Sequence, residues 1–367
     1  MLRSLLSNPL LLREMFSGVK GAVPGRATYP GLTVTLCVSL VVWGLYAVCV
    51  KAQSAFACGH WFVLAAFLQT WVWLYRSGAY AASAIAGADE EGALAVIATT
   101  PNTLEQALFA KMAGALAPLG VEALLIAFLN FVCFFWLGEG SLLLFFGVTS
   151  FQLAMIAGGA GVGLLFGRRL GDSAKAVRTY HKLALFVGLT GICMMYGSLV
   201  GHVAVVAFAL YLLLSLLPAL FEKFRIWTGT VALGLIILMP FSLMFDLNSI
   251  YTRAKNANPY FVLCRTAPID LSNEYVLRNV SADELYPFAN EFFCYYTGAK
   301  KLANDNLWMG RFIALIDYNP QVAAIVNREY LCWRVRKLSV FTWVGLVLFG
   351  VSILGVEYSV KRRLSSY

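Results

Sequence analysis

The chain has 367 residues, of which 60% are hydrophobic and 13% charged, and its mean hydropathy is +0.74. Soluble domains carry about 25% charged and roughly 45–50% apolar residues, so this composition excludes an ordinary soluble fold. The net charge of +9 does not indicate nucleic-acid binding, because the basic residues gather at the ends of apolar runs, where anionic lipid holds them.

Eight apolar stretches are candidates for helices that cross the membrane, which takes about 20 residues for a hydrocarbon layer of roughly 30 Å. They are residues 30–50, 61–83, 111–137, 141–167, 183–200, 203–220, 229–247 and 339–358. The sequence therefore predicts an all-α polytopic membrane protein. Only Gly201 and His202 separate the fifth and sixth stretches, so a hairpin that does not fully cross is an alternative there.

The orientation follows from the lysines and arginines of the short loops, which favour the cytoplasmic side. On one side they are Arg3, Arg13, Lys20, Arg26, Arg168, Arg169, Lys175, Arg178, Lys182, Lys223, Arg225, Lys361, Arg362 and Arg363. The opposite short loops hold only Lys51. We therefore expect both termini in the cytoplasm and the protein in the cytoplasmic (inner) membrane.

The long segment 248–338 mixes charged and aromatic residues, and the even number of spans places it outside the cytoplasm. The basic cluster Arg334–Lys337 argues against this side. Ser281–Glu284 fits a capping box that opens a helix through about Phe293. Asn319-Pro320 predicts a break before another short helix.

Four predicted regions result from these boundaries. They are a cytoplasmic amphipathic helix in 1–28, a transmembrane bundle in 29–247, an extracytoplasmic helical segment in 248–338, and a last span with a basic tail in 339–367.

The extracytoplasmic side would hold four cysteines, Cys58, Cys264, Cys294 and Cys332. Disulfides persist in such compartments, and four cysteines allow three pairings. At least one disulfide bracing a folded outer cap is one hypothesis, and four free thiols are the alternative.

The sequence lacks several motifs that mark phosphate binding or catalysis. The Gly-x-x-x-x-Gly-Lys-Ser/Thr phosphate loop is absent, as are the Gly-x-Ser-x-Gly and His-Glu-x-x-His motifs. We therefore predict no catalytic residue, no metal site and no cofactor bound by this chain.

The most informative stretch lies between the second and third spans, at residues 88–106. The acidic run Asp89, Glu90 and Glu91 suits the start of a short amphipathic helix. Such a helix should end before Pro101, and a second one should begin near Asn102 or Thr103. The alternative is an ordinary solvated loop.

This stretch resembles the signature of type-2 ABC exporter permeases, in which acidic residues precede Gly-Thr-Leu, Thr-Pro and a lysine at the next span. The matching residues here are Glu90, Glu91, Gly92, Leu94, Thr99, Thr100, Pro101 and Lys111. The chain departs from the pattern at Ala93, where the family usually has threonine. In the family this segment is the coupling helix that enters a groove on the ATPase subunit. The resemblance therefore implies that Asp89, Glu90, Glu91, Gly92, Leu94, Thr100 and Pro101 bind that partner.

Three further stretches are similar to the same family. Asn8-Pro9 with Arg13-Glu14 is similar to its opening, Gly159-x-x-x-Gly163 leads into a basic loop, and Asn258-Pro259 stands before the last span. The family usually has six spans, so a pair around 203–247 would be an addition. The resemblance implies ABC ATPase subunits and a second permease copy or homologue as partners, with ATP and Mg²⁺ held by the ATPase.

Two charged residues lie inside predicted spans, Arg76 in the second and Glu122 in the third. Ionisable residues inside the membrane are costly and are candidates for a functional role. Because these spans are antiparallel neighbours, we expect the two side chains to approach each other in the cytoplasmic half. A purely structural ion pair, or Arg76 reaching the inner interface, is the alternative.

The sequence thus predicts the transmembrane permease subunit of an ATP-driven exporter for an unidentified substrate. A stand-alone secondary transporter is an alternative, since Pro118, Pro218 and Pro240 are positions where spans can break. A membrane-embedded enzyme and a non-transporting anchor for an ATPase are the others.

Overall fold

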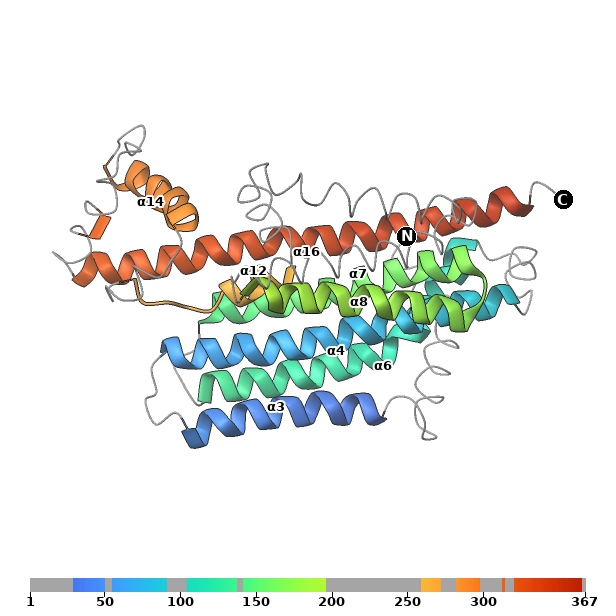
Figure 1. Ribbon diagram of the computed structural model, residues 1–367, viewed down its shortest axis with the longest axis horizontal. Helices are drawn as coiled ribbons and strands as arrows, with labels where there is room; N and C mark the ends of the chain where they lie inside the picture. The colour runs from blue at the N-terminus through green and yellow to red at the C-terminus, as the bar shows by residue number, and fades with distance from the viewer. Residues whose placement is uncertain are drawn as a thin grey trace, which may run out of the picture.

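The computed structural model describes residues 29–49, 55–90, 104–136, 141–195, 259–271, 282–297, 312–313 and 320–364. Every regular element within these ranges is a helix, as the sequence predicts. Figure 1 shows the long helices lying side by side along one common direction. Residues 1–28 and the predicted spans 203–220 and 229–247 lie outside the described part.

The first five predicted spans each overlap a helix, but the fifth helix begins at Ser173, ten residues before the predicted span 183–200, so that most of the predicted basic loop before this span is helical. These helices are α3 (Tyr29–Cys49), α4 (Ala55–Glu90), α6 (Leu104–Trp136), α7 (Leu142–Leu170) and α8 (Ser173–Met195). In the described part, three stretches are long and apolar enough to cross a membrane: Leu116–Trp136, Leu142–Leu170 and Gln321–Ser359. The protein is therefore an α-helical membrane protein, and the total of eight spans remains a prediction.

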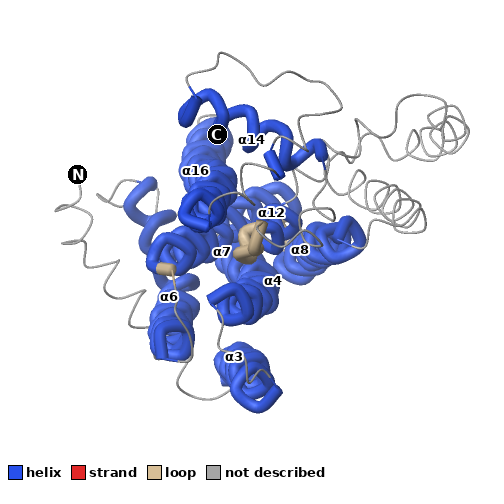
Figure 2. Tube along the Cα trace, turned by 90° about the vertical axis from the view of Figure 1, so that its left-hand side faces the viewer, coloured by secondary structure: helices blue, strands red, loops and turns tan. Residues whose placement is uncertain are grey.

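The bundle is arranged around α7, which lies near the middle of the end-on view, with α3 and α16 (Pro320–Leu364) toward opposite edges (Figure 2). The peripheral helices carry large apolar side chains that are exposed on the surface of the bundle. Phe128 of α6 is 69% exposed and Trp343 of α16 is 68% exposed. A soluble protein rarely leaves so much apolar surface open, whereas lipid covers it at no cost.

A tight turn joins α7 to α8. Gly171 has φ 66°, a left-handed conformation that glycine adopts without strain, and its N–H donates to the Gly167 carbonyl at 3.1 Å. Asp172 then begins α8, because its Oδ1 accepts the Lys175 N–H at 2.9 Å. Arg168 and Arg169 in the last turn of α7 place this turn at a membrane boundary.

The last helix differs from the prediction. Instead of a short helix after Asn319-Pro320 and a separate span 339–358, α16 runs without interruption from Pro320 to Leu364. Pro320 occupies its first position, where proline is well tolerated, and no glycine or proline follows until the span itself. Its 45 residues extend about 67 Å at 1.5 Å per residue, roughly twice the hydrocarbon thickness.

The N-terminal part of α16, which exceeds the length needed to cross the membrane, contributes to a small aromatic core. α14 (Ala282–Thr297) begins directly after Ser281, as the capping box predicts, and lies beside the N-terminal part of α16 (Figure 1). Phe288 packs edge-to-face on Tyr330, with ring centroids 4.9 Å apart, and also contacts Trp333. α14 and the N-terminal part of α16 thus form a packed unit at one end of the bundle. α12 (Pro259–Arg265) packs instead against α8, α16 and α4.

The hypothesis of a disulfide in this region is wrong for the pairings considered. Cys58, Cys264 and Cys332 are all free thiols, so no bond joins any two of the four cysteines. Cys58 is instead buried in the bundle, where its thiol lies 3.5 Å from the Phe134 carbonyl. Packing of aromatic side chains, rather than a covalent bridge, holds α14 on α16.

Candidate functional site

Arg76 of α4 and Glu122 of α6 form a buried ion pair. Nη1 of Arg76 lies 2.8 and 2.7 Å from the two carboxylate oxygens of Glu122. The two side chains are only 12% and 4% exposed. Charge-assisted hydrogen bonds of this length are the strong ones in proteins, and in a surrounding of low dielectric constant they hold two helices firmly together.

Further donors surround the Glu122 carboxylate. Thr35 of α3 donates to Oε1 at 2.6 Å, and the indole N–H of Trp73 donates to the same oxygen at 2.9 Å. Arg76 in turn lies 3.4 Å from the Tyr80 hydroxyl and contacts the Tyr80 ring. Glu122 therefore joins α3, α4 and α6 at one point, which we call the charged layer (Thr35, Trp73, Arg76, Tyr80 and Glu122).

A second polar cluster lies on the same helices about two turns away, and we call it the amide layer (Ser39, Trp43, Gln69, Asn130 and Gln152). Gln69 and Asn130 exchange two hydrogen bonds of 2.8 and 3.2 Å. Gln69 also donates to Ser39 at 2.8 Å and accepts from Gln152 of α7 at 3.2 Å, while Trp43 donates to Asn130 at 3.1 Å.

Helical spacing explains why the two layers align. Thr35, Ser39 and Trp43 follow each other at four-residue intervals on α3, which places them on one face. Glu122 and Asn130 are eight residues apart on α6, about 12 Å along its axis. Arg76 and Glu122 come together as the sequence predicts, whereas the amide layer was not predicted. The available signal was the pair of hydroxyl residues Thr35 and Ser39, four residues apart, together with single amides within apolar runs at Gln69, Asn130 and Gln152.

Glycines of α7 bring it into direct backbone contact with its neighbours. A methyl group at Gly163 would lie 2.0 Å from the Gly78 carbonyl oxygen of α4, and one at Gly167 would lie 2.5 Å from that of Ala82. On the other face, one at Gly161 would lie 2.9 Å from Cα of Phe349 in α16. The close approach predicted for Gly159 and Gly163 is thus confirmed, and it extends further along α7.

The structure describes the helices that precede and follow the predicted coupling segment. α4 continues through Glu90, so Asp89 and Glu90 lie in its last turn instead of opening a new helix, because the alanine-rich run after Tyr80 favours continued helix. α6 begins at Leu104, next to the predicted capping residue Thr103. The remaining predicted partner-binding residues, Glu91, Gly92, Leu94, Thr100 and Pro101, lie outside the described residues.

The described residues contain no group of three or more His, Cys, Asp or Glu side chains that would hold a metal ion. The described part of α6 is also unbroken at Pro118, one of the positions considered for a broken span. Pro218 and Pro240 lie outside the described residues. What the site offers chemically is a set of saturated hydrogen bonds that fix the packing of four helices.

No protein-family model, no curated protein and no solved structure matches this chain.

Proposed function

We propose that this protein is the membrane-spanning permease subunit of an ATP-driven exporter and that a separate ATPase docks on residues 89–105. The observation that carries the proposal is the run Glu90-Glu91-Gly92 followed by Thr100-Pro101, which resembles the coupling segment of type-2 ABC permeases. This run begins in the last turn of α4 (Ala55–Glu90) and precedes the start of α6 at Leu104.

The packing of α4 and α6 supports this proposal. The Arg76–Glu122 ion pair joins the two helices about 21 Å from the end of α4, given 1.5 Å per residue. Thr35 adds α3 through the same carboxylate. A force applied to the connection between α4 and α6 would therefore move α3, α4 and α6 together and would not separate α4 from α6.

The glycine contacts provide an interface along which such a movement can take place. α4 meets α7 through Gly78 and Gly163, where side chains do not interlock, and α7 meets α16 in the same manner at Gly161. Smooth backbone surfaces allow helices to shift past one another in small steps, which is how packed interfaces switch between discrete arrangements. Closure of the ATPase would in this way move α3, α4 and α6, and with them α7 through the Gln152–Gln69 hydrogen bond, against α16.

The energy source lies in the partner. ATP and Mg²⁺ would be held by ABC ATPase subunits, since the chain has no phosphate-loop motif. A second copy of the chain or a homologue would complete the path, and the apolar faces of α3, α6 and α16 would contact lipid or that copy. Export would take place across the cytoplasmic membrane.

A co-purification experiment tests the proposal. The tagged chain is isolated from its native membrane, and its partners are identified by mass spectrometry. We expect an ATPase with a phosphate loop to co-purify, and E91K with L94D to reduce its recovery while leaving membrane insertion intact. E291K, a charge reversal on α14 far from the segment, is the matched control and should retain the ATPase.

The same purified material, assayed for transport and for ATP hydrolysis, separates the alternatives. Absence of any ATPase, with transport activity of the purified chain driven by an ion gradient, would establish the secondary transporter instead. ATP hydrolysis by the purified chain alone would also contradict the proposal. An ATPase that co-purifies without any substrate transport in vesicles would favour the non-transporting anchor.

A further inference from the structure

A groove of about 870 Å³ follows α8 near the turn that joins it to α7. It is lined by Tyr75, Asp172, Ser173, Ala174, Val177, Arg178, His181, Lys182 and Leu185. Its volume lies within the range of roughly 300–1,000 Å³ that small-molecule sites occupy. Neither the polar layers nor the predicted coupling segment includes any of these residues.

Aromatic contacts fix α8 against α4 along this groove. The rings of His181 and Tyr75 are stacked, with centroids 3.8 Å apart and planes 5° from parallel. Beside them, the Tyr180 hydroxyl donates to the Leu74 carbonyl at 2.5 Å.

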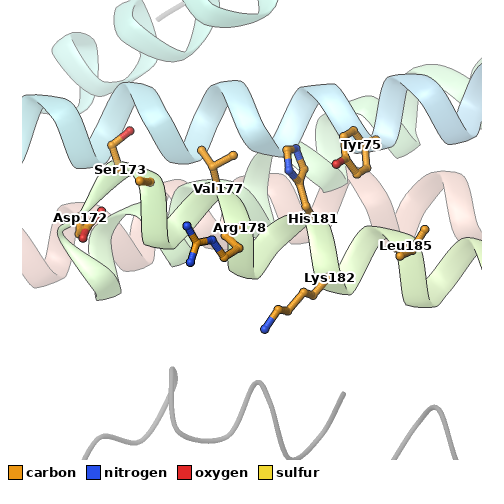
Figure 3. Close-up of a pocket in the computed structure, with 9 residues that line it drawn as sticks. Tyr75, Asp172, Ser173, Val177, Arg178, His181, Lys182 and Leu185 are labelled. Carbon is orange, nitrogen blue, oxygen red and sulfur yellow. The ribbon is translucent and has the colours of Figure 1, made fainter. Parts of the chain in front are cut away.

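Two cations provide the charge of the groove. Arg178 and Lys182 are four residues apart on α8, so their side chains are neighbours on one face. Figure 3 shows both projecting to the same side, away from α4. Like charges at this spacing repel each other, and neither residue has a salt bridge with a described residue. A bound anion would relieve this repulsion.

The other charged residue of the groove does not neutralise them. Asp172 stands at the far end, about 9 Å from Arg178 along the helix axis, where it accepts the Lys175 N–H and caps α8. The two cations therefore face an open part of the groove with no carboxylate beside them among the described residues.

The groove changes character along its length. The groove runs from the α7–α8 turn, which the basic residues at the end of α7 place at the membrane boundary, along α8 past Arg178 and Lys182. Its other end is apolar: Leu185 is 42% exposed and Tyr75 is 38% exposed. A ligand that fits such a gradient has an anionic group at one end and an apolar chain at the other.

We propose that this groove binds an anionic phospholipid, with the headgroup phosphate between Arg178 and Lys182 and an acyl chain along Leu185 and Tyr75. Anionic lipids are the abundant membrane molecules with this chemistry, and basic pockets at helix ends hold their headgroups. A soluble phosphate compound would use the two cations but would gain nothing from the apolar end. The proposal does not depend on an ATPase partner.

The binding experiment uses the full chain purified in a neutral detergent and monitored by native mass spectrometry. It is titrated separately with phosphatidylglycerol, with phosphatidylcholine of the same chain length, and with glycerol phosphate. We expect phosphatidylglycerol to bind more tightly than the other two. R178Q/K182Q should weaken its binding about 30-fold, from the loss of two cations near the surface.

R169Q/K175Q is the matched control, because it removes two positive charges beside the same turn from residues outside the groove. It should leave phosphatidylglycerol binding within about twofold, a change far below the tenfold that 1.4 kcal/mol represents. If R178Q/K182Q does not stay monodisperse, K182Q alone should still weaken binding about fivefold. Equal effects of the groove and control variants, or glycerol phosphate binding as tightly as the lipid, would overturn the proposal.

Discussion

Gly163 of α7 lies directly against Gly78 of α4, so closely that a methyl group at position 163 would be 2.0 Å from the Gly78 carbonyl oxygen. The Tyr180 ring covers the other side of Gly78, which leaves α4 no space to retreat. The interface between α4 and α7 therefore requires glycine at both positions for a packing reason rather than for backbone conformation.

The first prediction follows from this contact. G163A should destabilise the bundle by about 1–3 kcal/mol, the usual cost of overpacking, because backbone must move to admit the methyl group. The measurement is the thermal unfolding temperature in detergent. G350A on α16 is the control, since a methyl group there meets no atom within 4 Å, and it should leave that temperature unchanged or raised. Equal effects of the two substitutions would contradict the contact.

The second prediction concerns the ion pair. E122Q leaves Arg76 buried without its counter-charge, and we expect a loss of about 3–5 kcal/mol in unfolding free energy. R76Q/E122Q removes both charges and should cost less than E122Q alone. Unfolding of the single and double variants in detergent provides the comparison. A double variant that loses the sum of the two single effects would show that the charges do not interact.

The third prediction concerns the amide layer. Gln69 makes hydrogen bonds to Ser39, Asn130 and Gln152, so Q69L leaves several buried polar groups without a partner. We expect a loss of about 1–2 kcal/mol, since hydrogen bonds inside membranes are individually modest. S352A is the control, because Ser352 donates only to the Leu348 carbonyl of its own helix. Q69L should therefore lower the unfolding temperature more than S352A does. An equal decrease for the two variants would contradict the hydrogen bonds of the amide layer.

The fourth prediction concerns the orientation in the membrane. A single cysteine at position 304, in an otherwise cysteine-free chain, should react with a membrane-impermeant reagent added from outside intact cells. Labelling only after the cytoplasmic side is opened would place residues 248–338 inside. The basic cluster before the last span is compatible with either side, because Arg336 pairs with Glu291 at 3.0 Å and Lys337 lies over the Trp333 ring.

Much of the helical architecture is predictable because long apolar runs have few structural solutions in a membrane. The start of α14 after Ser281 follows from a local capping pattern, and the turn after α7 follows from the Gly171-Asp172 pair. The continuity of α16 is not predictable from hydropathy alone. Its first turns are polar enough to suggest a separate element, yet helix propensity carries the chain through Arg334 into the span.

The site is predictable only in part, and the reason is physical. Arg76 and Glu122 are conspicuous because charges inside apolar runs are rare. The amide layer depends on which faces of α3, α4, α6 and α7 meet, a property of tertiary packing that residue spacing on one helix does not determine. The disulfide hypothesis for Cys58 was wrong for the same reason, since that residue faces the bundle interior, 0% exposed.

The proposed docking of an ATPase on residues 89–105 is tested most directly by site-specific photo-crosslinking in native membranes. A photoreactive residue replaces Leu94 in the predicted coupling segment, and a second variant carries it at Phe128, which is 69% exposed on α6, as the control. We predict that the probe at position 94 crosslinks to a protein with an ATPase phosphate loop and that the probe at position 128 does not. Failure to capture such an ATPase from position 94, or equal capture from both positions, would contradict the proposed function.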